Sequence, residues 1–171
     1  MGNRQIMLSA LKKHTFSALA GLGFTGKYPN FRRKLDHCIE LISFQTNKWG
    51  GSFTIEVSAV FPGYEITNYT LYEGVTEETF GVEATIKRHR LPGMFDGWFY
   101  YRDVYRKRTL FFGSVYYDVP EKDATHFVPP RGYKPVQIFS EDTAAAICKE
   151  INRQLEDAYQ WLQDFERRHN K

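Results

Sequence analysis

The sequence predicts an α+β fold: a single antiparallel sheet of about five to seven strands, with an N-terminal and a long C-terminal helix packed on one face. Apolar residues recur at helical spacing over residues 4–20 and 141–168, whereas several segments between residues 30 and 118 alternate apolar and polar side chains. Strands that follow one another without intervening helices favour antiparallel pairing. The 171 residues are expected to form one domain, 1–171, long enough to bury about 70% of its unfolded surface.

The predicted N-terminal helix ends in a glycine-rich segment. Its apolar side comprises Leu8, Leu11, Thr15, Leu19 and Leu22. Residues 21–26 also match the GxGxxG fingerprint of dinucleotide sites, which requires a strand before it and a helix after it. Here a helix precedes the glycines and Tyr28-Pro29 follows them. We therefore interpret Gly21 and Gly23 as a helix stop.

Residues 37–61 predict a β-hairpin around which the other strands are arranged. Its second strand alternates Phe53, Ile55, Val57, Ala59 and Phe61 with polar side chains, and Gly50 and Gly51 supply the turn. With Thr46 placed opposite Ser52, Leu41 faces Val57 on the core side. Glu40 and Glu56 then become diagonal neighbours on the reverse face, roughly 7–8 Å apart at Cβ.

The remaining segments are assigned in chain order. Residues 31–34 predict a short edge strand, 64–72 and 80–86 two further strands, and 98–105 and 109–118 two aromatic-rich strands; residues 119–135 predict an irregular loop. Ser140 is expected to cap the C-terminal helix, with Glu141 and Asp142 in its first turn. The apolar stripe of that helix is Cys148, Ile151, Leu155, Ala158, Leu162 and Phe165.

Composition and motifs exclude several function classes. The net charge of +3 does not by itself require a nucleic acid partner. No apolar run approaches the about 20 residues of a membrane span, and no secretory signal is found, so we expect a cytoplasmic protein without a membrane partner. The five histidines and two cysteines show no metal-ligand spacing, so no metal or cofactor is expected. Cys38 and Cys148 are expected to be reduced, and one disulfide between them remains an alternative.

Several short segments together carry a family resemblance. They are Leu19-Ala20-Gly21-Leu22-Gly23-Phe24, Phe31-Arg32-Arg33, Ile42-Ser43-Phe44-Gln45, Trp49-Gly50 and Phe53-Thr54-Ile55, with a looser fit at Arg90-Leu91 and Trp98. This succession resembles the domain of unknown function 4304 family of bacterial proteins. The resemblance implies a bacterial, cytoplasmic, single-domain α+β protein. It implies no catalytic residue, and the aromatic and basic stretch 98–108 departs from it.

Two surfaces are candidates for binding. One is the polar reverse face of the hairpin with its flanking arginines; the other is the stretch 87–108, which has seven basic and two acidic side chains interleaved with aromatic ones. The candidate residues are Glu40, Glu56, Arg32, Arg88, Arg90, Trp98, Tyr101, Arg102 and Arg106. At both places we prefer a plainer interpretation. The hairpin face would be a solvated surface whose carboxylates pair with Arg32, Arg88 or Arg90, and the stretch 87–108 would be an aromatic core strand followed by a basic turn.

Three functions follow from these candidates, in order of preference. The first is a non-enzymatic binding module with a protein partner, similar by fold class alone to immunity proteins that neutralise toxins. It predicts that charge reversal at Arg102 or Arg106 abolishes complex formation without changing the melting temperature. The second is a nucleic-acid-binding protein that uses the basic aromatic stretch. The third is an enzyme in which Glu40 and Glu56 act as general acid and base.

Overall fold

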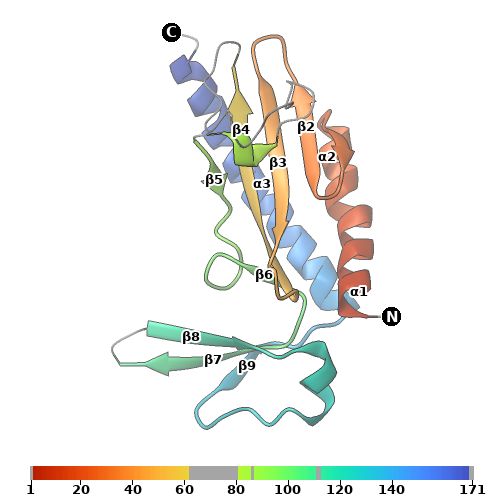
Figure 1. Ribbon diagram of the computed structural model, residues 1–171, viewed down its shortest axis with the longest axis vertical. Coiled ribbons are helices and arrows are strands. Elements are labelled where there is room, and N and C mark those ends of the chain that lie inside the picture. Colours follow the sequence, from red (N-terminus) through yellow and green to blue (C-terminus); the bar gives the residue numbers. More distant parts are fainter. Residues whose placement is uncertain (1, 62–80, 86, 111–112, 170–171) are drawn as a thin grey trace.

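The structure, a computed structural model, describes residues 2–61, 81–85, 87–110 and 113–169. It is an α+β fold with helices at both ends of the chain and antiparallel strands between them, as the sequence predicts (Figure 1). The N-terminal helix consists of α1 (Asn3–Ala10), a π-helical segment η1 (Leu11–Phe16) and α2 (Ser17–Gly21). The C-terminal helix, α3, spans Glu141–His169.

Six strands of the described chain form the main sheet. They are β1 (Thr25–Lys27), β2 (Asn30–Lys34), β3 (Ile39–Thr46), β4 (Ser52–Val60), β5 (His89–Arg90) and β6 (Phe99–Tyr100). Their order is β1-β2-β3-β4-β5, and β6 pairs with the start of β4. All of these pairings are antiparallel. The helices lie together behind this sheet in the view of Figure 1, on one face.

The core lies between the helices and that face. All six residues of the predicted α3 stripe are buried, and they pack with Phe53, Ile55 and Val57 of β4 and with Met7 and Leu11 of the N-terminal helix. Ser140 caps α3 as predicted, because its Oγ accepts a hydrogen bond from the backbone N–H of Thr143 at 3.2 Å. No helix among the described residues is long and apolar enough to span a bilayer.

The part of the chain that follows the main-sheet strands and precedes α3 forms a second sheet. It consists of β7 (Val104–Thr109), β8 (Gly113–Asp118) and β9 (Lys134–Gln137), in the order β8-β7-β9. A 3-10 helix, η4 (Glu121–His126), lies between β8 and β9. In Figure 1 this sheet lies below the main sheet and runs across its strands. The main sheet confirms the expected antiparallel sheet, and the second sheet is an additional feature that was not expected, because alternation identifies strands but not the sheet that each strand joins.

The hairpin register differs by one residue from the expectation. Thr46 pairs with Phe53, and Ile42 pairs with Val57. The expected register, with Thr46 opposite Ser52, would have put Leu41 on the core side. In the structure Ile42 and Phe44 belong to the core cluster, because a shift of one residue exchanges the two faces of a strand.

Two other strand predictions have different outcomes. Residues Val82–Ala84 form a 3-10 helix, η3, where a strand over 80–86 was expected. The alternation there has no partner strand among the described residues, since β4 pairs instead with β5 and β6. The strand expected at 64–72 lies outside the described residues.

Candidate functional site

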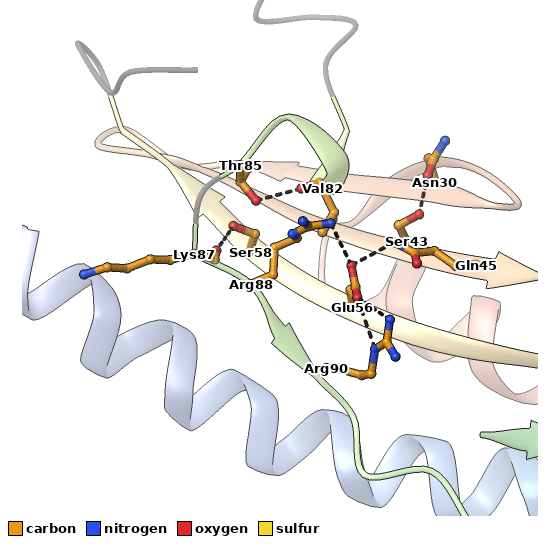
Figure 2. A network of polar contacts seen from close by, with 10 residues as sticks. All are labelled: Asn30, Ser43, Gln45, Glu56, Ser58, Val82, Thr85, Lys87, Arg88 and Arg90. Atoms are coloured by element: carbon orange, nitrogen blue, oxygen red, sulfur yellow. Dashed lines mark hydrogen bonds and ion pairs between the residues drawn. The ribbon is translucent and has the colours of Figure 1, made fainter. Parts of the chain in front are cut away.

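Glu56 is the centre of a polar network on the sheet face opposite the helices. The register places Ser43 of β3 on one side of Glu56 and Arg90 of β5 on the other. Arg90 donates to Glu56 Oε1 from Nε at 3.1 Å and from Nη2 at 2.9 Å. Arg88 Nη1 and Gln45 Nε2 donate to Oε2 at 3.3 and 2.7 Å (Figure 2). Both carboxylate oxygens are therefore bonded within the protein.

The same row of side chains continues across the sheet. Ser43 donates from Oγ to Oδ1 of Asn30, its partner on β2, at 2.8 Å. Two residues along β4 from Glu56, Ser58 donates to the backbone carbonyl of Lys87 at 2.6 Å. The segment η3 contacts both β3 and β4, and Figure 2 shows it above this face.

This polar face is buried and not solvated. Ser43 and Glu56 are each 6% exposed, and Thr54 and Ser58 are 1% exposed or less. The arginines that pair with Glu56 keep 41% and 49% of their side chains exposed. The plainer interpretation of Glu56 was thus correct about its arginine partners and wrong about its solvation. The network fixes β5 to β4, and the guanidinium groups of Arg88 and Arg90 are its accessible part.

Glu40 lies on the other side of the sheet. It pairs across the strands with Ala59, a core residue, and is 2% exposed. Its carboxylate accepts a hydrogen bond from Arg33 Nε at 2.5 Å. Arg33 also donates to the carbonyl of Leu22 at 2.8 Å and lies over the ring of Phe24. The proposed acid and base pair of Glu40 and Glu56 was therefore wrong, because the true register places the two carboxylates on opposite faces.

Three of the aromatic and basic candidates belong to the junction between the two sheets. Tyr101 is buried and stacks on Phe53 of the core. Arg102 donates to Asp118 Oδ2 at 3.1 Å and to the carbonyl of Trp49 at 3.3 Å, and its side chain is 18% exposed. Trp98 is half-buried and forms an isolated bridge with Phe95. These residues hold the structure together and are poorly placed to bind a partner.

Arg32 and Arg106 lie in different sheets. Arg32 is on β2, paired with Thr25 of β1 and Leu41 of β3, and it is half-buried. Arg106 is on β7, between Tyr116 of β8 and Lys134 of β9. The structure therefore divides the nine candidates among two faces of the main sheet, the junction and the second sheet.

The second sheet carries a surface that combines basic and apolar side chains. Arg106, Lys107, Arg108 and Lys134 lie on its strands, and none of them forms an ion pair with an acidic side chain within the described residues. Five of the large apolar side chains exposed to solvent are also here: Leu110, Val115, Tyr117, Val128 and Ile138, with Leu110 97% and Val128 83% exposed. Arg106, Arg108 and Lys134 share one face of this sheet, whereas Lys107, Val115 and Tyr117 share the other. We call these nine residues, which lie on both faces and beside the strands, the basic sheet surface.

The aromatic rings of this sheet are largely occupied by one another. Phe127, which follows η4, stacks on Tyr117 with a centroid distance of 5.3 Å and packs on Tyr105 at 5.1 Å. On the other face Tyr116 packs on Phe95 of the junction at 5.4 Å. Base stacking requires a free ring face, so these contacts reduce the platform that a single-stranded nucleic acid could use.

Burial shifts the pKa of several groups outside these surfaces. It raises the pKa of the Cys148 thiol to about 11 and that of Tyr159 to about 12, and it lowers the pKa of His89. Both cysteines are free and buried, so the alternative of a disulfide between them is not realised.

A comparison with known protein families identifies the family of this chain. The model of a family described as "Domain of unknown function (DUF4304)" matches residues 16–100. The chain belongs to the DUF4304 family. Comparison with curated proteins and with solved structures gave no match. The DUF4304 match runs from the end of η1 to β6 and stops before the second sheet, so the basic sheet surface lies wholly beyond it.

The sequence pointed to part of this surface but missed its extent. Arg106 was a candidate because of its basic neighbours, whereas Val115, Tyr117 and Lys134 were not. The alternation in residues 113–118 was a usable signal, since pairing two exposed strands brings their side chains onto common faces. No comparable alternation in the proline-containing segment 119–135 indicated that β9 joins this sheet.

Proposed function

We propose that this DUF4304 protein is a non-enzymatic binding module that docks an acidic protein partner on the basic sheet surface. The observation that carries the proposal is that this small sheet holds both basic side chains without an acidic partner among the described residues and exposed large apolar side chains. Protein interfaces combine apolar anchors with charges complementary to those of the partner.

The contrast with the main sheet supports this choice. There Glu56 forms ion pairs with Arg88 and Arg90, and Glu40 with Arg33, at N–O distances of 3.3 Å or less. On β7 three consecutive basic residues, Arg106, Lys107 and Arg108, form no ion pair with an acidic side chain among the described residues. A basic surface without acidic partners in the described part of the chain attracts a partner of opposite charge.

A bacterial, cytoplasmic setting belongs to the same proposal. The two free, buried cysteines suit a reducing compartment. An acidic protein partner would also suit an immunity-like role, in which a small domain binds and neutralises another protein, although this rests on analogy of fold class.

The proposal is tested by co-purification from native lysate treated with nuclease, using matched charge variants. The test variant is Arg106→Glu with Arg108→Glu, since these residues share a face of β7. The control is Lys12→Glu with Lys149→Glu, which makes the same change in net charge at exposed helical positions. We expect the test variant to weaken capture of a stoichiometric acidic protein at least about tenfold while the control retains it. Equal capture by both variants would refute the proposed surface.

The same experiment separates the nucleic acid alternative. Material that disappears with nuclease, and whose binding falls steeply with salt, would indicate phosphate recognition by the basic residues of β7. Protein capture that persists after nuclease treatment would exclude that explanation.

A further inference from the structure

Three different metal-ligating side chains meet where the β2–β3 connection contacts the end of α3. They are His37, Cys38 and Glu166, and their ligand atoms all lie within 4.8 Å of one another. His37 Nε2 lies 3.2 Å from Glu166 Oε2, and Cys38 Sγ lies 3.3 Å from Glu166 Oε1. We propose that these residues form a binding site for a divalent transition-metal ion of the zinc type.

The distances suit a tetrahedral ion. Zinc binds imidazole nitrogen and carboxylate oxygen at about 2.0–2.2 Å and thiolate sulfur at about 2.3 Å. Two ligands of a tetrahedral ion at such bond lengths are separated by roughly 3.3–3.6 Å. The distances from Glu166 to His37 and to Cys38 are close to this range. These two distances join different carboxylate oxygens of Glu166, and all ligand atoms lie within 4.8 Å of one another, so an ion between the three groups requires the ligands to converge around it.

The backbone on both sides of the site is held in place. The backbone N–H of Leu35 donates to the carbonyl of Cys38 at 2.9 Å, which closes the turn that presents His37. On the helix, the neighbouring Leu162 and Phe165 are at most 1% exposed, so the last turns of α3 are anchored in the core. Fixed ligands lower the cost of ordering a site on binding.

The chemistry of the donors selects the ion. Imidazole, thiolate and carboxylate together suit zinc and its spectroscopic substitute cobalt, whereas magnesium and calcium prefer oxygen ligands alone. In the metal-free protein the thiol of Cys38 donates to Glu166. Binding replaces that proton with the ion and releases it to solvent, which leaves two negative ligands opposite a charge of +2.

The surroundings leave room for a further ligand. His37 has 44% of its side chain exposed, so the site is accessible from solvent. A hollow of about 80 Å³ next to the site is lined by Cys38 together with Lys34, Asp36 and Phe61, but not by His37 or Glu166. Water that enters at the exposed side of His37 would complete a four-coordinate ion bound by three protein ligands.

The test titrates cobalt, followed by zinc in competition, into the full-length untagged protein after treatment with a chelator. The variants are His37→Ala, Cys38→Ser and Glu166→Gln; the controls are Cys148→Ser and His126→Ala, which change the same residue types elsewhere. We expect one cobalt ion per chain with a thiolate charge-transfer band that zinc abolishes and magnesium does not. The band should disappear in Cys38→Ser, and affinity should fall at least about tenfold in the other two variants.

Two results would overturn the proposal. One is the absence of stoichiometric cobalt binding, which would leave a hydrogen-bonded cluster only. The other is binding that the controls weaken as much as the ligand variants do. Because His37 is largely exposed, His37→Ala is expected to keep the melting temperature of the parent, so the test holds even where Cys38→Ser does not fold.

Discussion

At the scale of single residues, the two buried glutamates of the hairpin show how a carboxylate is accommodated in a buried position on either face of a sheet. Each is at most 6% exposed and is held by one or more arginines on a neighbouring strand. A buried charge without such partners would cost several kcal/mol. Glu40 and Glu56 therefore have a structural role that depends on their arginine partners.

Replacing Glu56 with Gln tests this role. The amide keeps the shape of the side chain, but in either orientation its NH₂ group faces a donor, namely Arg90 or Arg88 with Gln45. We expect the free energy of unfolding to fall by about 1–3 kcal/mol. Breaking a fully buried ion pair costs about 3–5 kcal/mol. The loss expected here is smaller because the arginines stay partly solvated.

Urea denaturation measures this change, with the exposed Glu156→Gln on α3 as its control. A loss no greater than that of the control would contradict the structural role of Glu56.

At the scale of elements, α3 and the main sheet meet through one continuous apolar stripe. The contact extends beyond β4 to the edge of the sheet, where His89 of β5 stacks on Trp161 of α3 with ring centroids 5.3 Å apart. Trp161 in turn stacks on Phe165 of the stripe. The short strand β5 is thus held by Glu56 on one face and by α3 on the other.

The His89 contact makes this packing sensitive to pH. Burial lowers the pKa of His89 below its ordinary value of 6.5, so the folded state favours the neutral ring. Above that value His89 is neutral in both states and has no effect. As the pH falls from 6.5 through the lowered pKa, the unfolded state binds the proton first and stability is lost.

We expect His89→Phe, which keeps the stacked ring without titrating, to lose less stability than the parent over that pH range. Thermal unfolding of both proteins measures the difference, and His126→Gln in the exposed η4 serves as control. Parallel pH profiles for the parent and His89→Phe would show that the site does not titrate as inferred.

At the scale of the whole molecule, a small set of polar contacts joins the two sheets. Arg102 bonds to Asp118 of β8 and to the carbonyl of Trp49 in the β3–β4 turn. Gly51 has a φ of 81°, which favours glycine, and a Cβ there would also meet the guanidinium of Arg102. Gln137 of β9 adds bonds to the carbonyls of Tyr100 and Arg102 at 2.8 and 2.7 Å.

Arg102→Met should therefore loosen the second sheet without unfolding the main one. Loss of charged, partly buried hydrogen bonds costs about 1.5–3 kcal/mol, so we expect amide exchange in β7–β9 to become at least about tenfold faster while α3, β3 and β4 keep their protection.

Arg106→Met on β7 is the matched control for this prediction, because it removes the same charge without touching the junction. Uniform acceleration throughout the chain would contradict a local role of Arg102. The hypothesis that Arg102 is free to bind a partner is therefore replaced by a structural role at the junction of the two sheets. Charge reversal at Arg106 remains the test of partner binding.

The elements themselves were largely predictable because their signals are local. The α3 stripe, the Ser140 cap and the turn glycines Gly50 and Gly51 each depend on residues a few positions apart. The segment over 80–86 shows the limit of that reasoning, since alternation describes a strand only where a partner strand is available.

The sequence by itself determined the α+β class, the ends of the helices, the alternating strands of the hairpin and membership of the DUF4304 family. Only the tertiary structure decided the register of β3 on β4, the separation of the second sheet, and the meeting of His37 and Cys38 with Glu166. The reason is physical. Periodicity and capping arise between neighbours along the chain, whereas register and convergence arise from packing between distant segments, where a shift of one residue moved Glu40 to the opposite face from Glu56.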